Sequence, residues 1–318
     1  MYRQILLQED QHDLQRIVWR QKQDEPIQEF RLNTLTYGLA SAPYSATRCL
    51  LQLAIEKQEQ YPEVCRMLRN DFCIDDLLSG GDCVSTLKMI KTDLTDILNS
   101  AGFTLHKWNS NESSIVNNYS KLPILPTSNE IKALGICWNT TNDSLQYKIR
   151  TVEKTERPTK QSILSIITQI YDPLGSDPLM GPTINCAKII LQQLWKLKLS
   201  WDESLPLNLH TIWIRYQEKI ESMSLTSIPQ HVICSEAQQI KMHRFCDASE
   251  SAYRVCIYIR SKDKSGQIHT QLLCAKSRVV PLKQFTLPRL ELCGALLLAK
   301  LGQRMKQALS INIDAIHY

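Results

Sequence analysis

The sequence lacks most of the features that mark secreted, zinc-binding or membrane-spanning proteins. None of its 11 cysteines stands at Cys-x-x-Cys spacing, and none is combined with histidine at the spacing of a zinc site. No apolar run approaches the roughly twenty residues that a membrane-spanning helix needs, and residues 1–10 are too polar for a signal peptide. Glycine and proline, at 10 and 13 residues, are too few for a linker or a fibrous chain. These absences predict a soluble intracellular protein with reduced thiols, expected in the cytoplasm or the nucleus.

What is present is the composition of a globular chain. The 318 residues are 43% hydrophobic and 22% charged, and this length is enough for two or three domains with their own cores. Lysine and arginine (37) exceed aspartate and glutamate (32), which gives a formal net charge of +5. A mildly basic chain permits a polyanionic partner without requiring one.

Two adjacent carboxylates, Asp75 and Asp76, stand where a short apolar run meets a glycine turn at Gly80 and Gly81. This pattern predicts the tip of a β-hairpin. Adjacent like charges repel, so the pair is costly unless a cation lies between them. Mg²⁺ prefers carboxylate oxygens, and two such ions can hold the attacking and leaving oxygens of a phosphoryl transfer. Taken alone, the pair fits a solvated loop better than a metal site.

Three stretches of different texture follow one another along the chain. The first carries expected strands at 15–20, 30–35, 105–108 and 133–138, and expected helices at 44–58 and 84–101. The second is mostly helical over 158–222, with breaks expected at Pro158, Pro173, Pro178 and Pro182. The third holds a strand that ends at Asp247, strands at 252–260 and 268–275, and a helix capped by Thr286.

The helical stretch is basic. Between Ser144 and Trp201 there are eight basic residues and four acidic ones. On charge alone, an ordinary solvated helix face is slightly favoured over a nucleic-acid groove.

Asp247 closes a strand, and Glu291 lies one turn inside the helix that Thr286 caps. The two carboxylates can converge only if this helix packs across the sheet, which its apolar stripe permits. Such a pair could hold a divalent metal for phosphodiester hydrolysis. The residues alone favour a plainer interpretation, in which the helix dipole stabilises Glu291 and Asp247 belongs to a strand-to-turn junction.

Segments in the same order along nearly the whole chain resemble one family, the BEL/Pao long-terminal-repeat retrotransposon polyproteins. Residues 69–80, which contain Cys73-Ile74-Asp75-Asp76, resemble the polymerase signature, as do residues 105–111. Residues 170–175 and 194–202 resemble the connector of the family. Residues 245–249 and 288–293, with Asp247 and Glu291, resemble the opening of its ribonuclease H domain.

The resemblance implies an α+β fold in three parts. These are an incomplete reverse-transcriptase palm at 1–147, a mostly helical thumb and connection at 148–235, and an incomplete ribonuclease-H-like α/β domain at 236–318. It implies that Asp75 and Asp76 bind Mg²⁺ or Mn²⁺ in the palm, and that Asp247 and Glu291 do so in the ribonuclease H site. The residues implied on the nucleotide and nucleic-acid side are Gly38, Ser41, Pro43, Cys73, Leu134 and Gly135. The implied partners are an RNA template, a DNA primer, an RNA–DNA hybrid and dNTPs, with the basic stretch contacting phosphates irrespective of sequence.

The sequence departs from the family pattern in its residues and at its ends. Cys73 stands where the family usually has tyrosine near the primer terminus. In the ribonuclease H strand, Arg254 stands where the family has a small glycine, and the larger side chain is expected to crowd the hairpin. The family's first palm aspartate precedes the segment matched here by Met1, and its third ribonuclease H aspartate follows the strand that here stops at Tyr318. Each site is therefore expected to lack at least one carboxylate, and the chain is expected to show little or no catalysis.

Two other interpretations stay open. The chain can be a non-catalytic nucleic-acid-binding protein, either domesticated or a remnant. It can also be a fragment that folds poorly, because a ribonuclease H sheet that stops before its fourth strand leaves an exposed edge.

Overall fold

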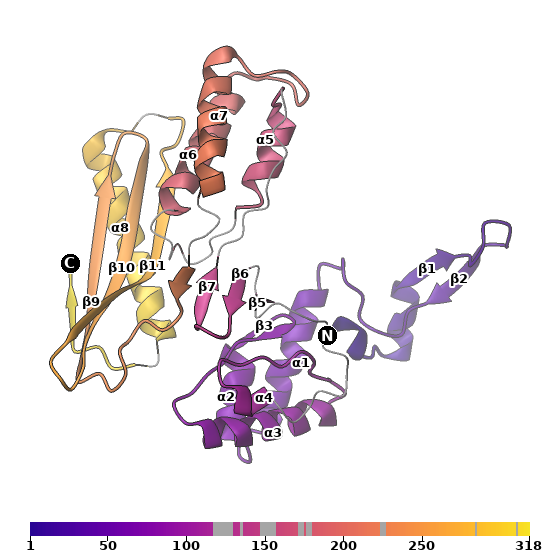
Figure 1. The fold of residues 1–318 in the computed structure, drawn as a ribbon. Helices are drawn as coiled ribbons and strands as arrows, with labels where there is room; N and C mark the ends of the chain where they lie inside the picture. The colour runs from indigo at the N-terminus through magenta and orange to yellow at the C-terminus, as the bar shows by residue number, and fades with distance from the viewer. Residues whose placement is uncertain are drawn as a thin grey trace. The chain divides into compact units, whose positions relative to one another are not determined.

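The computed structural model describes residues 1–116, 130–133, 136–146, 157–170, 175, 180–222, 227–283, 285–309 and 311–318. The chain forms two compact units, Met1–Thr127 and Ser128–Tyr318, whose elements are drawn in Figure 1. Each unit has a hydrophobic core of its own.

The first unit is a helical body with two short β-hairpins. Its elements are η1 (Tyr2–Gln4), η2 (Glu9–Leu14), β1 (Arg16–Trp19), β2 (Gln28–Arg31), α1 (Ala42–Glu56), α2 (Pro62–Asn70), β3 (Phe72–Cys73), β4 (Asp76–Leu77), α3 (Val84–Ser100) and α4 (Ser113–Val116). Helices α1 and α2 carry Pro43 and Pro62 in their first turns, where a helix needs no backbone donor. The helices expected at 44–58 and 84–101 are confirmed to within two residues.

The core of this unit lies where the apolar faces of α1, α2 and α3 meet. Leu53 from α1, Leu68 from α2 and Leu98 from α3 are buried, and Phe103 closes the cluster after the last helix. Gly102 ends α3 in a left-handed conformation with φ +79°, as the sequence predicts. The apolar periodicity of this segment therefore marks a face that is buried.

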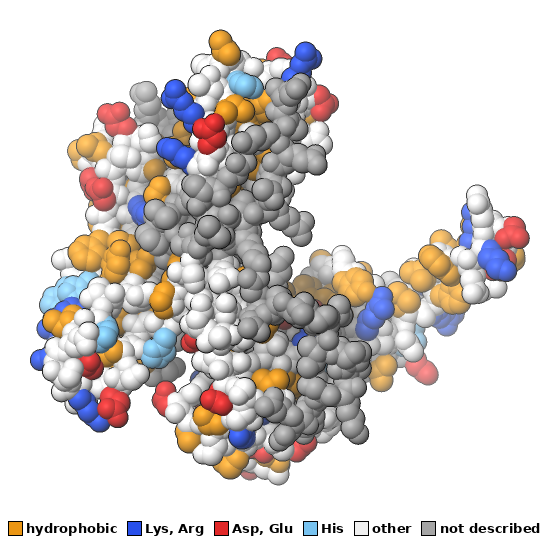
Figure 2. Space-filling model, in the orientation of Figure 1, with side chains coloured by type: hydrophobic (Ala, Val, Ile, Leu, Met, Phe, Trp, Pro, Cys, Tyr) orange, Lys and Arg blue, Asp and Glu red, His pale blue; other side chains and the backbone are white. Residues whose placement is uncertain are grey.

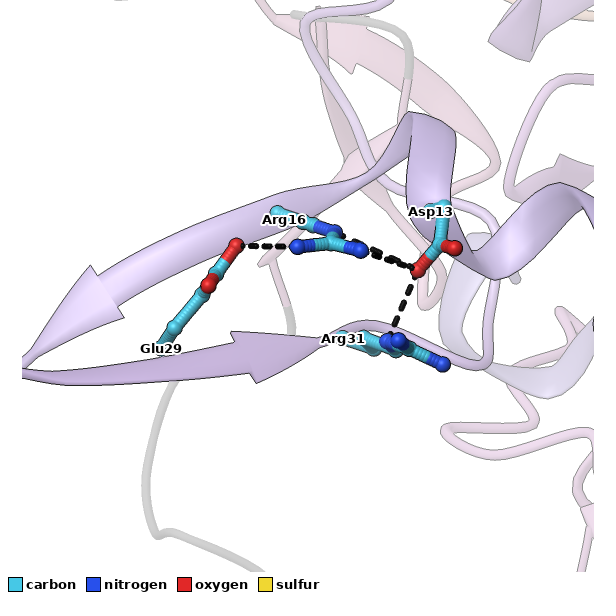
Figure 3. Close-up of polar contacts among 4 residues, drawn as sticks. All are labelled: Asp13, Arg16, Glu29 and Arg31. Atoms are coloured by element: carbon cyan, nitrogen blue, oxygen red, sulfur yellow. Dashed lines mark hydrogen bonds and ion pairs between the residues drawn. The ribbon is translucent and has the colours of Figure 1, made fainter.

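The hairpin of β1 and β2 has one apolar face and one charged face. Ile17 is 43% exposed on the apolar side, and hydrophobic side chains lie along the hairpin in Figure 2. On the charged side, Arg16 donates to Glu29 and to Asp13, and Arg31 contacts the same Asp13 (Figure 3). These contacts raise the pKa of the Arg16 guanidinium, the hydrogen bond to Glu29 most of all.

The second unit contains, among its described residues, two four-stranded sheets and four helices. Its elements are β5 (Glu130–Ala133), β6 (Ile136–Asn139), β7 (Ser144–Gln146), α5 (Lys160–Ile167), α6 (Met180–Lys196), α7 (Leu207–Ser222), β8 (Ser227–Pro229), β9 (Gln239–Ala248), β10 (Ala252–Lys262), β11 (Ile268–Val279), α8 (Leu287–Ala308) and β12 (Ala315–His317). The strand order is β5-β6-β7-β8 in one sheet and β11-β10-β9-β12 in the other.

Helices α5, α6 and α7 pack around a buried tryptophan. Trp213 of α7 and Ile163 of α5 are fully buried in this helical cluster. A capping box begins α5: the Thr159 side chain accepts the Ser162 N–H, and the Ser162 hydroxyl accepts the Thr159 N–H. Pro182 lies in the first turn of α6, where proline is tolerated, so the break expected there is wrong.

The sheet β11-β10-β9-β12 has α8 packed on one face. Strands β9, β10 and β11 form an antiparallel meander, and β12 runs parallel to β9 on its other side. Met242 of β9, Ile257 of β10 and Leu297 of α8 are buried together between the sheet and the helix. A short fourth strand is therefore present, and the expectation that the sheet stops before it is wrong.

Some local expectations differ from the structure. Residues 105–108 form no regular element, and β2 ends at Arg31, before most of the strand expected at 30–35. Two strands, β5 and β6, stand where one was expected at 133–138. Within the described ranges, no helix is long and apolar enough to cross a membrane.

Candidate active site

The Asp75-Asp76 pair lies in a tight hairpin, as predicted. Cys73 of β3 is paired with Asp76 of β4, which leaves Ile74 and Asp75 as the turn. Ile74 has φ +56°, a left-handed conformation that costs free energy for a β-branched side chain. Strained residues of this kind gather at functional sites. The strain at Ile74 is a signal that the sequence pattern did not display.

Both carboxylates of this hairpin reach solvent. The Asp75 side chain is 60% exposed, and one of its oxygens lies 3.6 Å from the amino group of Met1. Asp76 is exposed as well. At the base of the hairpin, the Ser79 hydroxyl donates to the Asp71 carboxylate at 2.5 Å. The hairpin backbone fixes the position of this carboxylate pair, and the Met1 amino group is the opposite charge beside Asp75.

Three residues expected beside the nucleotide lie in the same unit as the hairpin. Gly38 has φ +94°, Ser41 is the N-cap residue of α1, and Pro43 lies in the first turn of that helix. All three are exposed. Across the described part of the chain, no hydrogen bond or ion pair joins them to Asp75 or Asp76.

The N-terminal segment packs against the apolar clusters beneath both the Asp75-Asp76 hairpin and the start of α1. Met1 and Ile5 pack against the large core cluster of this unit and also against the small cluster that contains Ala42 of α1. Phe72 and Leu77, from the two strands of the hairpin, pack on the same large cluster. The hairpin and the start of α1 therefore share one apolar support.

Leu134 and Gly135, expected in a primer-gripping hairpin, lie outside the described residues. Cys73, expected near the primer terminus, is exposed on β3. Its assignment, like that of the other nucleotide-side residues, stays a prediction.

Asp247 and Glu291 come from two elements that contact each other. Asp247 lies near the end of β9, paired with Arg254 of β10, and Glu291 lies one turn inside α8. The contact runs through Gly294, where a methyl group would lie 3.7 Å from Cβ of Cys246 and 4.0 Å from the Asp247 carbonyl oxygen. Gly294 follows Glu291 by about one helical turn. Helix α8 thus packs across β9 at Asp247, which is the condition for a shared site; the shared site itself stays a prediction.

The side-chain directions limit where such a site can form. Neighbouring side chains on a strand point to opposite faces, so Cys246 faces α8 and Asp247 faces the other side. Both Asp247 and Glu291 are exposed. A site that uses both carboxylates has to form around the end of the strand.

The sheet face opposite α8 is rich in rings and cations. His243 stacks on His317 of β12, with 4.8 Å between ring centroids. Burial lowers the pKa of His243, and the charges of His317, Arg260 and Lys241 lower it further. The imidazole of His243 therefore stays neutral to a lower pH than a free histidine.

Arg254 does not crowd the β9–β10 hairpin, contrary to the expectation from the sequence. The register between the two strands is continuous through the pair of Arg254 and Asp247. The guanidinium instead lies against Gly181 of α6, with Cζ 2.9 Å from the position that a Cβ would take. A glycine on the helix makes room for the large side chain on the strand.

The described residues offer two carboxylates at each candidate site. Within that part of the chain, no three histidine, cysteine, aspartate or glutamate side chains gather in a way that could hold a metal ion. A pair of carboxylates fits Mg²⁺, which is bound through one or two carboxylates and keeps several waters. A separate hollow, lined by residues 231–235 and 267–271 with Asp263, contains none of the candidate residues.

An antiparallel meander, a helix packed across it and a parallel fourth strand, with one carboxylate on the first strand and one on the helix, define a domain of the ribonuclease-H-like class. Sequence comparison is more specific. The family described as the Pao retrotransposon-like RNaseH-like domain matches residues 159–318, and the chain belongs to this family. The match begins at the N-cap of α5, so it includes the helical cluster as well as the sheet. No curated protein matches the chain.

Proposed function

We propose that this chain is the reverse-transcriptase and ribonuclease H region of a Pao-type retrotransposon polyprotein, and that it binds RNA–DNA hybrids. The observation that carries the proposal is the packing of α8 across β9 inside the matched domain, where the Asp247 backbone lies beside Gly294, about one helical turn after Glu291. Two-metal phosphodiester hydrolysis uses carboxylates in such an arrangement. The strained hairpin at Asp75 and Asp76 supports a second, polymerase site.

The proposed ion at both sites is Mg²⁺ or Mn²⁺. The four exposed carboxylates provide hard oxygen ligands and leave room for water and phosphate oxygens; they are Asp75, Asp76, Asp247 and Glu291. A bound ion would stabilise charge on the phosphate and on the attacking oxygen. The role of the protein is to hold the carboxylates and to orient the nucleic acid.

For the isolated chain we propose little or no catalysis. With two carboxylates in each site among the described residues, a divalent ion would be held weakly and the attacking oxygen would be poorly placed. The parent polymerase would use a DNA primer, an RNA template and dNTPs. The residues proposed on that side are Gly38, Ser41, Pro43, Cys73, Leu134 and Gly135.

A non-catalytic nucleic-acid-binding role is the second candidate. The charge of the helical cluster favours it: the described residues between 157 and 203 include five basic side chains and two acidic ones. Basic side chains gathered on one helical cluster attract the phosphates of a nucleic acid, whatever the base sequence. This role requires neither metal nor an intact pair of carboxylates.

Primer extension on an RNA template and cleavage of an RNA–DNA hybrid, each with Mg²⁺ or Mn²⁺, test catalysis. We expect trace product at most from the native chain, and the same from Asp75→Asn and Asp247→Asn. Robust synthesis that disappears in Asp75→Asn would overturn the proposed inactivity of the polymerase site. Hybrid cleavage that disappears in Asp247→Asn would do so for the ribonuclease H site.

Fluorescence anisotropy of a labelled RNA–DNA hybrid tests binding separately. The affinity should fall by orders of magnitude as salt rises from about 50 to about 200 mM. Binding releases cations from the phosphates, and this release is less favourable when the salt concentration is higher. Asp75→Asn should bind as the native chain does. A hybrid that stays unbound at the lowest salt would refute both candidate functions.

A further inference from the structure

Trp195, near the end of α6, and Trp201, in the segment after it, lie beside the ammonium group of a buried lysine. Lys160, the first residue of α5, has its Nζ 3.5 Å from the ring centroid of Trp195 and 5.0 Å from that of Trp201. The two indoles meet edge to face, with centroids 5.7 Å apart and planes at 90°. Lys160 also donates to the Leu199 carbonyl, and the Gln161 N–H donates to the Trp201 carbonyl. Three segments are thereby fixed to one another, and the cation–π contacts hold the rings.

The two indoles are nevertheless open to solvent. Lys160 is 5% exposed, whereas Trp195 is 51% exposed and Trp201 is 46% exposed. The buried cation fixes each ring from the protein side and leaves the rest of its surface free. A rigid aromatic ring that is open on one side is a stacking platform, because little conformational entropy is lost when a second ring lies on it.

The helical cluster that carries the platform is basic, with five basic and two acidic side chains among the described residues from 157 to 203. Lys196, the last residue of α6, and Lys198, in the turn that follows, are exposed. Two acidic residues nearby, Asp202 and Glu203, are exposed as well, and Glu203 also accepts the Ser200 N–H. The net positive charge of the cluster complements a polyanion such as the phosphate backbone of a nucleic acid.

We propose that Trp195 and Trp201 stack on unpaired bases of single-stranded nucleic acid, with Lys196 and Lys198 contacting the adjacent phosphates. The inference rests on the proposed nucleic-acid binding and names a place for it. Bases in a duplex already stack on each other and do not present their faces, so the platform selects a single strand. Lysines near the rings would hold the backbone without selecting a sequence.

Anisotropy with a labelled single-stranded RNA of mixed sequence tests the proposal on the full chain. Trp195→Ala and Trp201→Ala should each weaken binding by about tenfold or more, as expected for one lost base stack. Trp19→Ala, which removes an even more exposed tryptophan (62%) from the β1–β2 hairpin, should change the affinity less than about twofold. Lys196→Gln should reduce the slope of log K against log salt by about one.

A conservative variant separates stacking from folding. Trp195→Phe keeps an aromatic face and should bind between the native chain and Trp195→Ala, even if the alanine variant is poorly folded by circular dichroism. An unlabelled RNA duplex should compete far less well than an unlabelled single strand. Equal competition by the duplex, or binding by Trp195→Phe no better than by Trp195→Ala when both are folded, would overturn the stacking assignment.

The remaining outcomes distinguish this inference from the proposed function. If the native chain binds neither hybrid nor single strand, the proposed function fails and takes the inference with it. If the native chain binds both and the tryptophan variants are unaffected, the inference alone fails. An oligomer seen by sedimentation that disappears in Trp195→Ala, without any effect on RNA binding, would identify a protein contact instead and overturn it too.

Discussion

The glycines of α8 give a paired test of how this helix is seated on β9. A methyl group on Gly302 would lie 2.5 Å from Nη1 and 2.6 Å from Cζ of Arg244. Gly294, on the same helix, has ordinary room, with Cys246 Cβ 3.7 Å from the added methyl. We predict that Gly302→Ala destabilises the domain and that Gly294→Ala does not.

The magnitude follows from the contacts of Arg244. Its side chain is 6% exposed and donates to the Gly302 carbonyl at 3.3 Å and to the Tyr318 hydroxyl at 3.1 Å. An added methyl must displace the guanidinium and weaken these hydrogen bonds, and bonds of charged groups contribute about 1.5–3 kcal/mol each. Alanine in place of a helical glycine returns about 1 kcal/mol. Gly302→Ala should therefore cost about 1–2 kcal/mol, and Gly294→Ala should gain up to about 1 kcal/mol.

The assay has to resolve the domain from the rest of the chain, because the two compact units need not unfold together. Urea unfolding of the full chain, combined with hydrogen exchange of peptides from α8 and β9, does so. Arg244→Met is the matched background, since it keeps the length of the side chain without the guanidinium. In the Arg244→Met background, Gly302→Ala should no longer lower the free energy of unfolding, which corresponds to a coupling energy of about 1–2 kcal/mol between the two positions. Equal stability of the two alanine variants, or a cost that persists in Arg244→Met, would refute the reasoning.

Further predictions concern the helix caps Thr159 and Thr286, the thiol of Cys83, and Gly175, which lies close to the backbone of β11. In thermal unfolding, Thr159→Ala should cost about 1 kcal/mol because its capping hydrogen bond is lost. Thr286→Ala should cost little in that experiment, because the Thr286 side chain makes no such bond. Ser85, by its hydrogen bond, is the main cause that lowers the pKa of the Cys83 thiol to about 6, so iodoacetamide should alkylate Cys83 with a midpoint near pH 6, reacting with about 90% thiolate at pH 7. Ser85→Ala should move that midpoint upward, and an unmoved midpoint would contradict the assignment. Gly175→Ala should cost about 3 kcal/mol or more in urea unfolding, since Gly175 has φ +61° and its added methyl would run into the backbone of β11.

Regular apolar spacing made some elements predictable from the sequence. Helix α3 was found because Leu94 and Leu98 repeat at helical spacing and are buried. Residues 105–108 failed as a strand because Leu105 and Trp108 pack against the core without any neighbouring strand to pair with. Apolar alternation reports burial, and burial does not by itself supply a hydrogen-bonded partner. Strand β2 was misplaced because all of its residues are exposed, so no burial pattern marks its ends.

The candidate sites were predictable as residue types and not as geometry. The sequence named Asp247 and Glu291, but the contact of Gly294 with β9 depends on how a helix lies on a strand far from it in the chain. The left-handed backbone at Ile74 likewise contradicts the preference of its own residue type, so no local rule predicts it. The cluster of Lys160 with Trp195 and Trp201 joins residues across two helices, and composition alone shows only their presence.

The two glycine contacts of α8 also limit how the helix can move. A helix that touches a sheet at one point can turn about that point or slide along the strand. Gly294 lies against Cys246 and Asp247, and Gly302 lies against the Arg244 side chain, so the helix contacts residues of β9 at two points about 12 Å apart along its axis. Neither turning nor sliding is then possible without breaking one of them. The height of Glu291 above the strand is set by these two contacts, so an ion at the proposed site would have to fit a spacing that the fold already fixes.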